Sequence, residues 1–153
     1  MTYLHYKIVH ILGMALFFGA GLGTALVKVN ADRTRDPKTI AFAMRHVVLA
    51  DWLFTVPSGL IMPITGLMMT GWTWEQPWIR WGIGLYATAG LLWLPAAFMQ
   101  LRMRTLAVQA EKEGTPLPAA YWRLTRIWLA LGAPAFVAAM LTVYVMVVKQ
   151  PLW

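Results

Sequence analysis

The chain contains no cysteine and few charged residues, and both shortages limit what it can be. Without cysteine it forms no disulfide bond and offers no thiolate ligand to a metal ion or a haem iron. Charged residues make up only 12% of the 153 residues, against about 25% in ordinary soluble domains. Hydrophobic residues make up 59%. This balance predicts a membrane protein with the length of one modest domain.

Acidic residues are fewer than basic ones, which gives a formal net charge of +7. A basic surface is one way to bind nucleic acid. Here the basic residues instead cluster in two segments between apolar runs. In membrane proteins such clusters mark the cytoplasmic side of the bilayer. We therefore expect the lipid bilayer, and not nucleic acid, to be the partner of this chain.

Four apolar stretches are long enough to cross a membrane, which takes about 20 residues in a helix. Barrel strands are excluded because the stretches are too long for them. We therefore predict an all-α fold, a four-helix transmembrane bundle that forms a single domain over residues 1–153. The spans are expected at about residues 8–29, 47–70, 81–101 and 127–148.

The links between these spans predict the orientation of the chain. Links 30–46 and 102–126, taken with the residues at their edges, each hold five basic residues and two acidic ones. The link between the second and third spans holds only Glu75 and Arg80. The positive-inside rule then places both basic links in the cytoplasm and both termini on the outer side.

Local signals refine the expected bundle. The sequence RMRTLAVQAEKEG predicts that the third helix continues past the membrane as an amphipathic arm, ended by Gly114. Gly19 and Gly23 have the spacing of small residues that lets two membrane helices approach closely. Prolines inside the spans are expected to bend the helices and to free backbone carbonyls. They are Pro57, Pro63, Pro95 and Pro134.

Polar side chains at membrane depth are costly, so each is a candidate for function. The sequence places His10, His46, Asp51 and Gln100 in or at the edges of the spans. No phosphate loop, nucleophile elbow or His-Glu-x-x-His zinc motif accompanies them. The neutral imidazole of His10 is suited to bind haem iron, copper or zinc. The alternative is a hydrogen bond from His10 to a freed carbonyl of a bent neighbouring helix.

A haem site built from both His10 and His46 is not expected, because their depths differ by roughly 20 Å at ~1.5 Å per residue. We interpret His46 as an interface histidine beside Arg45. The residues expected at the depth of His10 include Met62 and Met140. A His–Met pair suits haem b, and a group of methionines with a histidine suits copper(I). The alternative is that these methionines only fill gaps in the bundle.

Two charged residues have alternative interpretations. Asp51 is the only acidic residue within a span. It would relay protons, or pair with Arg45, a hydroxyl group or a freed backbone N–H. Lys7 is expected at the outer face near His10, where it would neutralise a haem propionate or act as an ordinary interfacial anchor.

Distinctive motifs are spread over essentially the whole chain. They are RHVVLADWLFT, PITG at 63–66, WLP at 93–95, PLPAAYWRL, GAPAF and VMVVKQP. With these motifs the chain resembles a bacterial family of predicted integral membrane proteins, the domain-of-unknown-function family twenty-two sixty-nine. The resemblance implies a multi-pass protein of the bacterial inner membrane and names no reaction.

Two further stretches carry a more distant resemblance. They are KIVHI at 7–11, and Arg126 and Pro134 together with the VVKQP ending at 147–151. They resemble the first and last helices in the superfamily of the copper resistance D proteins and the haem-dependent membrane protoporphyrinogen IX oxidase. The histidine of the oxidase's Lys-x-x-His-Ile motif is implicated in haem binding. The resemblance therefore implies a haem ligand at His10.

The chain departs from the oxidase at two places. Gly132 and Ala133 stand before Pro134, where the oxidase has Asn-Glu, and Gln150 separates the lysine from the proline of the ending. These departures weaken the expectation that protoporphyrinogen is the substrate.

Three functions follow as alternatives. The first is a haem b protein with a redox role, in electron transfer or as a membrane oxidoreductase, whose second iron ligand is a methionine or comes from the partner chain of a homodimer. The second is copper handling by His10, His5 and methionines near the outer face. The third is a structural or accessory subunit of a larger membrane complex, without a cofactor. Reaction and substrate do not follow from these residues.

Overall fold

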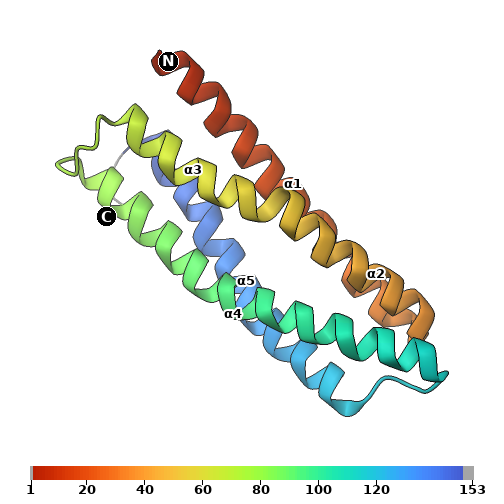
Figure 1. Ribbon diagram of the computed structural model, residues 1–153. Coiled ribbons are helices and arrows are strands. Elements are labelled where there is room, and N and C mark those ends of the chain that lie inside the picture. Colours follow the sequence, from red (N-terminus) through yellow and green to blue (C-terminus); the bar gives the residue numbers. More distant parts are fainter. Residues whose placement is uncertain (1, 150–153) are drawn as a thin grey trace. The chain divides into compact units, whose positions relative to one another are not determined.

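The computed structural model describes residues 2–149, so the end of the VVKQP motif, Gln150 and Pro151, lies outside the described residues. The described chain is helical and contains no strand. Figure 1 labels most of its helices. The elements are α1 (Tyr3–Thr34), α2 (Pro37–Ala50), η1 (Asp51–Thr55), α3 (Val56–Met69), α4 (Pro77–Glu113) and α5 (Ala119–Val148).

Within residues 2–149, four helical segments are long and apolar enough to cross a membrane. They are Tyr3–Thr34, Pro37–Met69, Pro77–Glu113 and Ala119–Val148. The second consists of α2, η1 and α3, which follow one another without a break. Large apolar side chains such as Leu91, Phe98 and Val147 are more than two-thirds exposed, which suits contact with lipid tails. The predicted all-α membrane fold with four spanning helices is confirmed.

The helices continue beyond the expected membrane boundaries. Between α1 and α2 the turn consists of Arg35 and Asp36 alone, with Arg35 in the left-handed region at φ 57°. The arm predicted after the third span is present, because α4 runs to Glu113. It ends at Gly114, whose φ of 63° is a conformation that glycine adopts without steric cost. The basic links are therefore mostly helical.

Asp36 starts α2. Its carboxylate accepts hydrogen bonds from the hydroxyl and the backbone N–H of Thr39 and from the backbone N–H of Lys38, while Pro37 fills the first helical position. These hydrogen bonds favour the ionised form, those from Thr39 most strongly, and they hold the pKa of the Asp36 carboxyl below its usual range.

A π-helical turn, η1, interrupts the second span. Pro57 follows it after one residue, Val56. A proline ring lacks an N–H and collides with the carbonyl four residues earlier in a regular helix. In η1 the backbone N–H of Val56 reaches back to the oxygen of Asp51, which widens the turn. The hydroxyl of Ser58 donates to the carbonyls of Phe54 and Thr55. Such wide turns are frequent at functional sites.

The chain divides into two compact units, which are described separately. The first comprises the residues up to Trp72 and Gln100–Trp122. In it, α1 packs along α2, η1 and α3 (Figure 1). Its buried core includes one face of α2 and one face of the α4 arm. The residues are Ile40, Met44 and Val47 of α2, and Met103, Ala107 and Ala110 of α4.

The second unit comprises Thr73–Met99 and the residues from Arg123 onward. Met146 packs against Gly82, where a side chain would come within 3.4 Å of the methionine methyl group. The ammonium of Lys149 lies 5.6 Å from the centre of the Trp78 ring, a cation–π contact.

Candidate functional site

His10 lies on α1 and faces α3. Its Nδ1 is 2.9 Å from the backbone oxygen of Met62 and 3.0 Å from the hydroxyl oxygen of Thr65. A carbonyl oxygen can only accept, so Nδ1 carries the proton and donates it to this bond. The lone pair of the imidazole is then on Nε2. This arrangement, with one ring nitrogen bonded to a backbone carbonyl, is the usual one for histidines that bind a metal through the other nitrogen.

The PITG motif shapes the surface on which His10 rests. The hydroxyl of Thr65 donates to the carbonyl of Ile61 at 2.8 Å, which leaves a lone pair for the N–H of His10. Gly66 lies under the ring, where a Cβ atom would come within 3.3 Å of Cε1 of His10. The sequence Thr65-Gly66 thus supplies both an acceptor and the space for the imidazole.

The methionines and the lysine expected near His10 are placed as follows. Met62 contacts His10 through its backbone oxygen, while its buried side chain packs against Gly13. Met140 belongs to the second unit and is 48% exposed. Lys7 is exposed and precedes His10 by one turn of α1. Among residues 2–149, no group of three or more His, Asp or Glu side chains is arranged to hold a metal ion.

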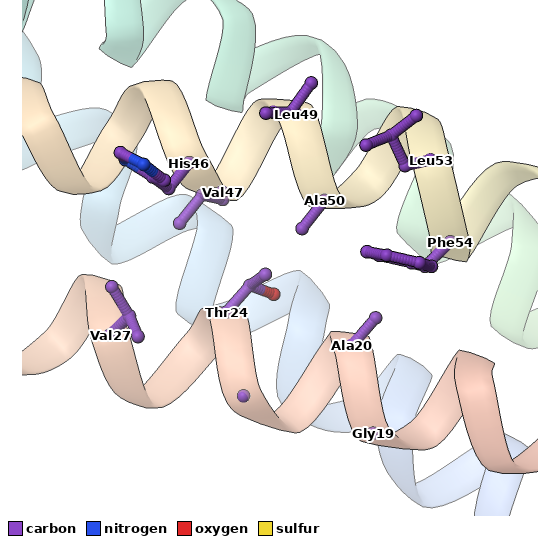
Figure 2. A pocket seen from close by; sticks show the side chains of 11 residues that line it. Gly19, Ala20, Thr24, Val27, His46, Val47, Leu49, Ala50, Leu53 and Phe54 are labelled. Carbon is purple, nitrogen blue, oxygen red and sulfur yellow. The ribbon is translucent and has the colours of Figure 1, made fainter.

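His46 lines a groove of about 400 Å³ between α1 and the second span. The groove is almost entirely apolar, and Figure 2 shows His46 near Val27, with Phe54 farther along toward Gly19. Nδ1 of His46 is 2.8 Å from the backbone oxygen of Phe42. Val27, the groove residue of α1 near His46, lies more than four helical turns beyond His10, in agreement with the expected difference in depth.

Asp51 begins η1 and is 7% exposed. The hydroxyl of Thr55 donates to its Oδ1 at 2.9 Å, so of the partners weighed from the sequence the structure shows a hydroxyl group. Arg45 instead forms an ion pair with Glu111 on the α4 arm. Oδ2 of Asp51 is buried and has no hydrogen-bond partner among the described residues. The buried side-chain amide of Gln100 interacts with the same carboxyl group.

Sequence reasoning missed a buried cluster of charged and polar groups in the first unit. Nζ of Lys28 is 2.6 Å from Oδ2 of Asp32, and the hydroxyl of Tyr121 donates to Oδ1 of Asp32 at 2.6 Å. Lys28 and Tyr121 are 1% and 0% exposed, so neither side chain is the solvated residue that a basic link suggests. The spacing of four residues between Lys28 and Asp32 is the one signal in the sequence that could have indicated the pair.

Comparison with protein families gives one result that covers nearly the whole chain. The model of a family described as predicted integral membrane protein (DUF2269) matches residues 4–150. The matched range includes His10, Asp51 and the buried cluster at Lys28. Comparisons with curated proteins and with solved structures give no match. The family description places its members in a membrane and names no reaction.

Proposed function

The chain belongs to this family of predicted integral membrane proteins, and from that premise we propose that it binds haem b inside the membrane. In this proposal Nε2 of His10 would hold the haem iron. The observation that carries it is the bond from Nδ1 of His10 to the backbone oxygen of Met62. This bond fixes the ring and the tautomer that a metal ligand needs. Bound haem supplies one-electron redox chemistry, in electron transfer or as a membrane oxidoreductase.

The residues around His10 fit a bound haem. The porphyrin provides four nitrogen ligands of its own, so a single protein imidazole suffices to hold the iron on one side. Gly66 provides the space for the imidazole against α3. Ile61 and Ile64, on the same helix, are 40% and 50% exposed, so α3 offers apolar surface to a bound porphyrin. Such surroundings exclude water and tune the potential of a redox group.

Other groups have proposed roles around the same site. Lys7, one turn before His10, would pair with a haem propionate at the membrane surface. A methionine, Met62 or Met140 in the sequence-based hypothesis, or a group from a second copy of the chain completes the iron coordination. The distant resemblance to the haem-dependent oxidase supports His10 as ligand. The replacement of its Asn-Glu by Gly132 and Ala133 favours a reaction other than protoporphyrinogen oxidation.

The proposed location is the bacterial inner membrane, with both termini on the outer side. Support comes from the two links rich in basic residues, which the positive-inside rule places in the cytoplasm. His10, near the start of the first span, then lies toward the outer leaflet. A haem at this place would be accessible to redox partners on that side.

An absorption spectrum of the detergent-purified protein, before and after dithionite, tests the proposal. We expect a Soret band and α and β bands that sharpen on reduction. A colourless protein after expression with ample haem would contradict haem binding. Metal analysis of such a preparation would then separate copper handling, with copper bound, from an accessory subunit that carries no cofactor.

A further inference from the structure

The carboxyl group of Asp51 is the one acidic side chain in the middle of a membrane span, and only half of it is paired. Oδ1 accepts the hydroxyl of Thr55, while Oδ2 is buried without a hydrogen-bond partner among residues 2–149. Buried polar atoms nearly always have a partner in native proteins, and an orphaned one calls for a physical reason. Asp51 is only 7% exposed, so atoms of the protein itself cover more than nine-tenths of the residue.

Among the described residues, no positive charge interacts with this carboxyl group. The side chains that hydrogen-bond to this carboxyl group are those of Thr55 and Gln100, and both are neutral. The ionisable residues on the elements that pack against η1 are few. On α1 the nearest are His10 and Lys28, which lie at opposite ends of the facing segment, and Lys28 is paired with Asp32.

The other elements that pack against η1 also carry few ionisable residues near Asp51. On α2 the nearest charged or titratable residues are Arg45 and His46, both exposed, and Arg45 is paired with Glu111. On the α4 arm they are Arg102 and Arg104, also exposed, and α3 contains none. An ionised Asp51 would therefore be an uncompensated negative charge in a medium of low dielectric constant, which is strongly unfavourable.

We propose that Asp51 is the centre of a binding site for one monovalent cation inside the membrane, a proton or a sodium ion. The oxygen donors of the site are the carboxylate of Asp51 and the hydroxyl of Thr55, and the side-chain amide of Gln100 interacts with the same carboxyl group. Oxygen ligands are those that hard cations prefer. With a proton, the carboxylate and H⁺ combine to a neutral carboxylic acid, which removes the uncompensated buried charge. The site is independent of the haem proposal.

The wide turn of η1 explains why such a site occurs at this position. The π turn before Pro57 directs Asp51 and Thr55, four residues apart, to the same buried face of the span. The hydroxyl of Ser58 satisfies carbonyls of the turn, so these need no cation of their own. Among the buried side-chain atoms of residues 2–149, Oδ2 of Asp51 is left without a hydrogen-bond partner.

Infrared spectroscopy of the protein in lipid membranes tests this site directly. The wild type is compared with Asp51→Asn at neutral pH in a sodium-free choline chloride buffer, in H₂O and D₂O. We expect the C=O band of a protonated carboxylic acid that shifts on deuteration and is lost in Asp51→Asn. Sodium chloride is then added at constant ionic strength. Loss of the band identifies a sodium site, and an unchanged band identifies a proton site.

Two further variants control the assignment. Glu111→Gln removes a carboxylate that already pairs with Arg45 at a partly exposed position, so it should leave the band unchanged. Gln100→Leu removes the amide beside Asp51 and should shift the band, which assigns it even if Asp51→Asn does not fold. Absence of any carboxylic acid band in sodium-free buffer, from neutral to acidic pH, would overturn the proposal. So would a band that neither Asp51→Asn nor Gln100→Leu alters.

Discussion

The hydroxyl of Tyr121 donates a 2.6 Å hydrogen bond to Asp32, a residue 89 positions earlier in the chain. The other carboxylate oxygen of Asp32 is 2.6 Å from Nζ of Lys28, and the Lys28 ammonium lies 5.3 Å from the centre of the Tyr121 ring. Each group thus contacts both others. The cluster joins the end of α1 to the start of α5 within the first unit.

This geometry predicts that Asp32→Ala is strongly destabilising. Removing the carboxylate leaves the buried ammonium of Lys28 without its counter-charge, and breaking a buried pair costs about 3–5 kcal/mol. Unfolding in dodecyl sulfate, followed by circular dichroism, measures the loss. Glu111→Ala is the matched control, because it removes the partly exposed pair with Arg45, which contributes less than about 1 kcal/mol. Equal losses in the two variants would refute the structural role of the cluster.

The cap at Asp36 predicts a dependence of stability on pH. The pKa of this carboxyl is lower in the folded protein than its unfolded value of about 4, because Thr39 and Lys38 donate hydrogen bonds to the ionised form. Its stabilising effect is therefore complete above about pH 4 and is lost as the pH falls through the folded pKa. The unfolding free energy of Asp36→Asn should fall less than that of the wild type over this acid range. Identical pH profiles would contradict the contribution of the cap.

Gly66→Ala is expected to move the imidazole of His10. The new methyl group would lie 3.3 Å from Cε1, so the ring must shift away from α3 and the 2.9 Å bond from Nδ1 to Met62 must lengthen. ¹⁵N NMR of labelled histidine detects the change as a shift of the Nδ1 resonance. Gly84→Ala is the control, since no atom lies within 4 Å of its added methyl group. An unchanged Nδ1 resonance in Gly66→Ala would show that the ring does not rest on this glycine.

The proposed orientation can be tested because the chain has no cysteine of its own. Glu75 and Lys112 are both exposed, and each can be replaced singly by cysteine. In spheroplasts, a thiol reagent that cannot cross the membrane should label Glu75→Cys and leave Lys112→Cys unlabelled until the membrane is opened. The reverse pattern would place the termini in the cytoplasm.

The helices could be predicted because their signal is local. An apolar run of about 20 residues indicates a membrane helix regardless of what packs against it. The depth estimate also placed Met62 opposite His10, and the two residues are in contact. The atom that makes this contact, a backbone oxygen, could not be predicted, because it depends on how α1 is rotated against α3.

Other features depend on contacts between distant segments and could not be predicted from the sequence. Lys28 belongs to a basic link by its neighbours in sequence, yet Asp32 and Tyr121 hold it in the interior. The π turn at Asp51 has a local cause in Pro57, but the interaction of Asp51 with Gln100 depends on how distant segments of the chain pack. The order of residue types along the chain predicts neither the burial of Lys28 nor the contact between Asp51 and Gln100.

The measurement that most directly tests the central claim is the haem content of three purified proteins, determined from their Soret absorbance per polypeptide. They are the wild type, His10→Ala and His46→Ala, whose histidines both direct Nδ1 to a backbone oxygen. We predict that His10→Ala loses the haem while it stays helical and monodisperse, and that His46→Ala keeps it. Full haem content in His10→Ala would contradict the assignment of His10 as the iron ligand.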